Sequence, residues 1–85
     1  MGQCERLYEK IKKNPKNVKF EEIDKLLVNH GGFIPRNGKG SHCIYKHPSL
    51  NDIEDYVNIP RAKPIKEIYI KRALRKFEKV MGLEN

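Results

Sequence analysis

The chain has few cysteines and no long apolar run. These two shortages argue against a disulfide-rich, metal-binding, membrane-spanning or secreted protein. Cys4 and Cys43 lie far apart and fit no metal-binding or redox spacing, so we expect two free thiols. No apolar run approaches the roughly 20 residues that cross a bilayer, and the first residues lack the apolar core of a secretory signal. We therefore expect a cytoplasmic protein with no membrane partner.

The chain is also short. Its 85 residues predict one globular domain with a modest core and no room for a large enzyme cleft. A hydrophobic share of 38% is enough for a small α+β domain and argues against disorder.

What the chain does have is positive charge, with 18 Lys and Arg against 11 Asp and Glu. The excess lies at the two ends, in residues 1–17 and 58–85, whereas residues 18–57 are close to neutral. A basic surface of this kind favours RNA, DNA, an anionic lipid or an acidic protein as partner. Membrane binding is the weakest of these choices.

The spacing of apolar residues predicts three helices and three strands. We expect helices over 4–13, 19–30 and from Pro64 to Gly82, and strands over 33–36, 41–47 and 55–60. Pro35 places the first strand at a sheet edge, where its missing N–H does no harm. The predicted fold is α+β, a three-stranded antiparallel meander with two helices on one face, preceded by a short helical extension (1–17) to a main domain (18–85).

The apolar stripes of the two main helices define the expected core. Pro64 is expected in the first turn of the last helix, which proline tolerates. The stripe of the middle helix comprises Phe20, Ile23, Leu26, Leu27 and His30, and that of the last helix comprises Ile65, Ile68, Tyr69, Leu74, Phe77 and Met81.

The chemistry is concentrated at the predicted hairpin, where residues 38–42 read Gly-Lys-Gly-Ser-His. Glycine lets a phosphate approach the backbone, lysine supplies charge, and histidine transfers protons near neutral pH. Cutting RNA without a metal needs a proton carrier and cationic groups at the phosphate. His42 is therefore the candidate catalytic residue, Ser41 a phosphate ligand or an orienting group, and Arg36 a cross-strand neighbour if the turn is short.

Simpler interpretations compete with this one. His42 is also explained as a polar strand residue beside an exposed turn, and alternation does not decide which strand face is buried. His30 and His47 are expected to be structural, and the three histidines have no zinc-site spacing. Asp52, Glu54 and Asp55 are carboxylates of the kind that bind Mg²⁺ in two-metal nuclease sites, but they fit a solvated loop better. No metal or cofactor is expected.

The last helix and its approach are strongly basic. These cations suit sequence-tolerant phosphate contacts, but they are equally compatible with a solvated helix face. They are Lys63, Lys66, Lys71, Arg72, Arg75, Lys76 and Lys79.

Four short motifs occur in a characteristic order: Val-Lys-Phe-Glu-Glu-Ile at 18–23, Gly32-Phe33, Gly40-Ser41-His42 and Ile59-Pro60. Together they resemble the HicA toxins of prokaryotic toxin–antitoxin systems. The resemblance covers about residues 5–83, and the stretch 14–17, Asn-Pro-Lys-Asn, is similar to longer family members.

The resemblance implies a double-stranded-RNA-binding-like α-β-β-β-α fold and a type II toxin that cleaves mRNA. It implies that His42 is catalytic and that a HicB-like antitoxin holds the protein inactive. Many members carry a further polar or histidine motif after Ile-Pro, whereas this chain reads Arg-Ala-Lys-Pro at 61–64. A second proton carrier would then be Lys63, a water or His47.

The leading hypothesis is a metal-independent ribonuclease. The residues expected to bind RNA beside His42 are Arg36, Lys39, Gly40, Ser41, Lys46, Lys63 and Lys66. The alternatives are a non-catalytic double-stranded-RNA-binding module and a protein-interaction domain whose basic face docks an acidic partner.

Overall fold

The computed structural model describes residues 2–37, 42–50, 52 and 55–83. The predicted turn residues Lys39, Gly40 and Ser41 lie outside the described residues. In chain order the elements are α1 (Gln3–Lys13), a 3-10 turn (Pro15–Asn17), α2 (Phe20–Lys25), a π-helical turn (Leu26–His30), β1 (Ile34–Asn37), β2 (His42–Lys46), β3 (Val57–Pro60) and α3 (Glu67–Met81).

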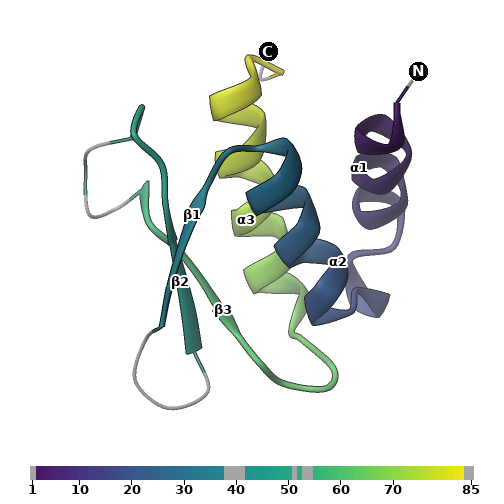
Figure 1. Ribbon diagram of the computed structural model, residues 1–85. Helices are drawn as coiled ribbons and strands as arrows, with labels where there is room; N and C mark the ends of the chain where they lie inside the picture. The colour runs from purple at the N-terminus through teal and green to yellow at the C-terminus, as the bar shows by residue number, and fades with distance from the viewer. Residues whose placement is uncertain (1, 38–41, 51, 53–54, 84–85) are drawn as a thin grey trace.

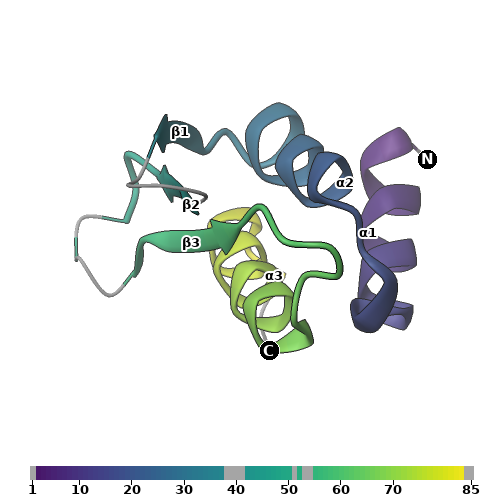
Figure 2. The ribbon, with the colours of Figure 1, turned by 90° about the horizontal axis from the view of Figure 1, so that it is seen from below.

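The strands form one antiparallel sheet in the order β1-β2-β3, which confirms the predicted α+β meander. Pro35 lies in edge strand β1, as expected. β3 begins two residues later than predicted, because Asp55 lies before the strand and pairs with Lys76 of α3. In Figures 1 and 2, α2 and α3 cover the same face of the sheet, and α1 lies beyond this helical layer, away from the strands.

The core lies between the sheet and the helical layer. Tyr45 is fully buried and its hydroxyl donates to Asp24 Oδ1 at 2.6 Å, which joins the central strand to α2. Burial, and then this carboxylate, raise the pKa of Tyr45, so the phenol stays protonated. The apolar side chains of this core include Ile23, Leu26, Leu27, Phe33, Cys43, Val57, Ile59, Ile65, Ile70, Ala73, Leu74 and Phe77.

Two glycines end helices as the sequence predicts. Gly32 has φ of +75°, a conformation that costs other residues energy, and it turns the chain from the π-helical turn into the sheet. Gly82 has φ of +71° and closes α3, with the Leu83 N–H donating to the Glu78 carbonyl at 2.8 Å.

The start and stripe of the last helix differ from the prediction. α3 begins at Glu67, so placing Pro64 in its first turn is wrong; Ile65 is buried from an extended segment ahead of the helix. Ile68 is 50% exposed and Met81 is 43% exposed, so the prediction that both belong to the core is wrong. The stripe instead runs through Ile70, Ala73, Leu74 and Phe77. Ile68 lies about 160° around the helix from Ile70, and Met81 stands in the last turn beyond the core.

The N-terminal helix packs on the helical layer. Ile11 is buried, and the Tyr8 hydroxyl donates to Glu78 Oε2 while its ring stacks on Phe77 with centroids 5.6 Å apart. The helix expected over 4–13 is confirmed, and the domain boundary at residues 17 and 18 stays a prediction.

Asp55 is the buried charged residue of the described chain. It is 7% exposed and accepts hydrogen bonds from Lys76 Nζ at 2.7 Å and Lys79 Nζ at 3.4 Å. The contact ties the segment before β3 to α3. The hydrogen bond from Lys76, followed by that from Lys79, holds the pKa of Asp55 below its usual range.

A pH dependence of stability follows from this pair of contacts. Because the folded-state pKa of Asp55 is depressed, its stabilisation is complete above the ordinary aspartate value of about 4 and is lost as pH falls through the lower folded value. Asp55→Asn should lower the melting temperature at pH 7 and flatten its decline below pH 4. A variant that melts in parallel with the wild type at every pH would contradict this assignment.

Candidate active site on the open face of the sheet

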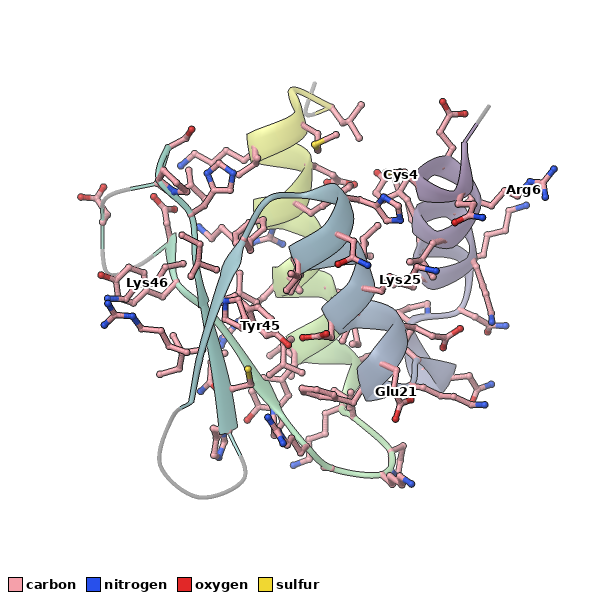
Figure 3. The ribbon with its side chains drawn as sticks, viewed as in Figure 1. Cys4, Arg6, Glu21, Lys25, Tyr45 and Lys46 are labelled. Atoms are coloured by element: carbon pink, nitrogen blue, oxygen red, sulfur yellow. The ribbon has the colours of Figure 1, made fainter. Side chains whose placement is uncertain are left out.

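The sheet has one face packed on the helices and one open face. Along β2 the side chains of Cys43 and Tyr45 are buried, so His42, Ile44 and Lys46 project to the other side. Figure 3 shows Tyr45 directed toward α2 and Lys46 on the opposite side of the strand. Within the described part of the chain no helix covers this open face (Figures 1 and 2).

The register shows which residues of the edge strands share the open face. Ile44 stands opposite Arg36 of β1 and Asn58 of β3, and residues directly opposite one another lie on the same face. We call the residues Arg36, His42, Ile44, Lys46 and Asn58 the open-face cluster. Arg36, His42 and Asn58 are exposed to solvent.

The imidazole of His42 has a specific partner. Its Nδ1 lies 3.1 Å from Oδ1 of Asn58. An amide oxygen only accepts hydrogen bonds, so Nδ1 carries the proton in this contact. In the neutral ring the lone pair is then on Nε2. The contact orients an exposed ring and leaves Nε2 available as a base.

The open face brings only part of the predicted cationic set near His42. Arg36 stands opposite Ile44, so Arg36 and His42 are cross-strand neighbours in the diagonal position and not directly opposite one another. Lys46 lies four residues along the strand, roughly 13 Å from His42. Its Nζ is 4.6 Å from the ring centroid of Tyr56.

Lys63 and Lys66, the two lysines before α3 that the sequence predicts to bind RNA, do not belong to the open-face cluster. Lys63 lines a hollow of about 590 Å³ with Lys16 and Phe20, and Lys66 lines a neighbouring one of about 410 Å³. Both are exposed, and both hollows are lined by residues of the helical side, not by the open-face cluster. Their role in RNA binding stays a prediction.

The other two histidines differ from His42 in their surroundings. The His47 ring lies edge-on to Phe33 with centroids 5.0 Å apart, and its Nδ1 accepts the Ser49 N–H at 3.0 Å. It is about 16 Å along the strand from His42, too far to share one phosphate. His30 has a buried Nε2 with no hydrogen-bond partner among the described residues.

The basic surface of α3 is partly neutralised by acidic side chains. Glu67 pairs with Lys71 at 3.3 Å, and Asp55 binds Lys76 and Lys79. Arg72 and Arg75 are exposed and make no ion pair within the described ranges. The cations of this helix therefore fall into two groups. Lys71, Lys76 and Lys79 contact carboxylates, whereas Arg72 and Arg75 face solvent.

Asn58 and Tyr56 are the residues of this region that sequence reasoning missed. Asn58 gives no signal in the sequence, because its contact with His42 depends on the pairing of two strands. Tyr56 stands next to β3 and its contact with Lys46 has the same origin. Only the register reveals them.

The described residues contain neither a metal-binding cluster nor a membrane-spanning helix. No group of three or more His, Cys, Asp or Glu side chains is placed to hold a metal ion. No helix there combines the length and apolarity that a membrane span requires. Both cysteines are free thiols, as expected, and Cys43 is buried.

Comparison with known protein families agrees with the resemblance seen in the sequence. Residues 20–78 match the family model described as the HicA toxin of bacterial toxin–antitoxin systems. The match begins at α2 and ends within α3, so it includes the whole sheet and His42. No curated protein and no solved structure gives a significant match. The chain belongs to the HicA toxin family.

Proposed function

We propose that this HicA-family toxin is a metal-independent endoribonuclease that cleaves mRNA, with His42 as its proton carrier. Membership of the family makes the chain the toxin of a toxin–antitoxin pair, with an antitoxin as partner. The observation that carries the proposal is an exposed imidazole held through Nδ1 by Asn58, on a sheet face that also carries Arg36 and Lys46.

In the proposed reaction His42 Nε2 removes the proton of a ribose 2′-hydroxyl. The 2′-oxygen attacks the adjacent phosphorus, a new P–O2′ bond forms, and the P–O5′ bond breaks. The departing 5′-oxygen takes a proton from a water. The products are a 2′,3′-cyclic phosphate and a 5′-hydroxyl, so no oxidant, metal or cofactor enters the balance.

Cations stabilise the charge that develops on the phosphate oxygens. Arg36 is the nearest cation that the register places on the face of His42, and its planar guanidinium matches two phosphate oxygens. Lys46, farther along the strand, is suited to a neighbouring phosphate. A HicB-like antitoxin that covers the open-face cluster would block both groups together.

Substitution of His42 tests its role as the proton carrier. Purified wild-type protein should cleave mixed mRNA in EDTA, and His42→Ala should lower the rate at least about 100-fold because the proton carrier is gone. His47→Asn, which changes a histidine away from the site, should retain cleavage. Circular dichroism and melting temperature check that each variant is folded.

Two outcomes would contradict the assignment to His42. Equal cleavage by His42→Ala would remove this residue from the mechanism. Wild-type protein that binds RNA without cutting it between pH 6 and 8 would instead favour the non-catalytic RNA-binding module.

Substitution of Asn58 tests its role as the positioning residue for His42. Asn58→Ala should lower the cleavage rate roughly tenfold, on the scale of one lost hydrogen bond. Asn58→Asp should move the acid limb of the pH–rate profile to higher pH, because a carboxylate favours the protonated imidazolium and the base must be neutral. An unmoved profile in Asn58→Asp, with the fold intact, would show that Asn58 does not act through His42.

A further inference from the structure

A narrow hollow runs beside the open face, between edge strand β3 and helix α3. It measures about 290 Å³, and its lining comprises Tyr56, Val57, Asn58, Tyr69, Arg72, Arg75 and Lys76. Figure 2 shows β3 and α3 next to each other along this edge of the molecule. We call this hollow the β3–α3 groove.

We infer that the β3–α3 groove binds the single-stranded RNA segment that flanks the phosphate cut at His42. The inference rests on the proposed function and adds to it the path and the strandedness of the substrate. Three observations carry it: the charge of the groove, its aromatic side chains, and its continuity with His42.

The charge of the groove comes from two arginines. Lys76 is bound to Asp55 at 2.7 Å, so its charge is largely balanced. Arg72 and Arg75 are three residues apart on α3, a spacing that places them on one side of the helix, and both line the groove. A guanidinium binds phosphate through two parallel N–H groups. The groove thus offers phosphate ligands rather than a neutral cleft.

The aromatic residues and the size favour a single strand. Tyr56 and Tyr69 are partly exposed in the groove, and unstacked bases bind to such rings. A volume of about 290 Å³ lies just below the usual range for drug-sized ligands and suits a base or a phosphate, not a duplex. An acidic protein segment would use the arginines but has less use for the tyrosines.

Asn58 connects the groove to the proposed cleavage site. Its side chain lines the groove and its Oδ1 is 3.1 Å from Nδ1 of His42. An RNA strand whose phosphate lies at His42 therefore has to pass only Asn58 to enter the groove. The residues that line the groove come from α3, β3 and Tyr56 next to β3, and α1 lies on the other side of the helical layer from the strands (Figures 1 and 2).

The test measures RNA binding in a His42→Ala background, where the RNA should stay intact. The probe is a fluorescent, unstructured 12-nucleotide RNA, with a duplex of the same sequence for comparison. The variant is Arg72→Gln/Arg75→Gln. The matched control is Arg6→Gln/Lys25→Gln, which removes two exposed cations of α1 and α2 on the side away from the sheet (Figure 3).

We expect the groove variant to raise the single-strand Kd at least about tenfold at low salt. The slope of log K against log salt should become less steep by about 1.4, since each lost phosphate contact contributes about 0.7 for a single strand. The control should change Kd much less, and the preference for single strand over duplex should disappear only in the groove variant.

Three results would overturn the inference: single-strand binding unchanged in the groove variant, single-strand and duplex binding weakened equally, or antitoxin binding lost while RNA binding stays intact. Failure of the proposed function is a separate outcome. If wild-type protein does not cleave RNA but the groove variant shows the expected loss of binding, the groove is supported as an RNA-binding site and only the proposed cleavage reaction is rejected.

Discussion

The burial of alternate side chains along β2 is the constraint on which the site depends. Tyr45 fills the core and donates to Asp24, so β2 cannot rotate or slip by one residue without removing this contact and exposing Cys43. The same constraint places His42, Ile44 and Lys46 on the opposite face. The exposure of His42 is therefore a consequence of core packing, and the two edge strands then determine its neighbours.

The distribution of charge follows the same division between a packed side and an open side. Asp55 and Glu67 pair with lysines of α3, whereas Arg72 and Arg75 face the groove next to β3. Glu78 contacts α1 through Tyr8 and Lys12, on the far side of the helical layer. Net charge alone says little about RNA binding, because the cations that make no ion pair within the described ranges matter more than their total.

Much of the fold is predictable from local patterns. Ile23, Leu26 and Leu27 recur at helical spacing and are buried, and Gly32 adopts the left-handed conformation that a helix-to-strand turn favours. Resemblance to the HicA family, carried by short motifs, is confirmed over residues 20–78. The spacing of apolar residues predicted the buried side of α3 less well. It includes Ile68 in the apolar stripe, but the side chain of Ile68 is exposed in the structure.

The site is less predictable, because it depends on contacts between strands. The run His-Cys-Ile-Tyr-Lys is apolar on neither face, so only the structure shows that Cys43 and Tyr45 are the buried pair. The sequence leaves open how close Arg36 comes to His42, and the register makes it a diagonal neighbour by setting Arg36 opposite Ile44. Asn58 reaches His42 from a strand 16 residues further along the chain, and no sequence motif encodes that contact.

The imidazole of His42 is open to solvent in the free protein, and the proposed function requires that bound RNA covers it. Diethyl pyrocarbonate modifies accessible neutral imidazoles, and mass spectrometry locates the modified residue. In the free protein His42 should react first and His30, whose Nε2 is buried, should react slowly. A 2′-O-methyl RNA, which has no 2′-hydroxyl to attack, should protect His42. An unreactive His42 in the folded protein, or equal reaction with this RNA bound, would contradict the account.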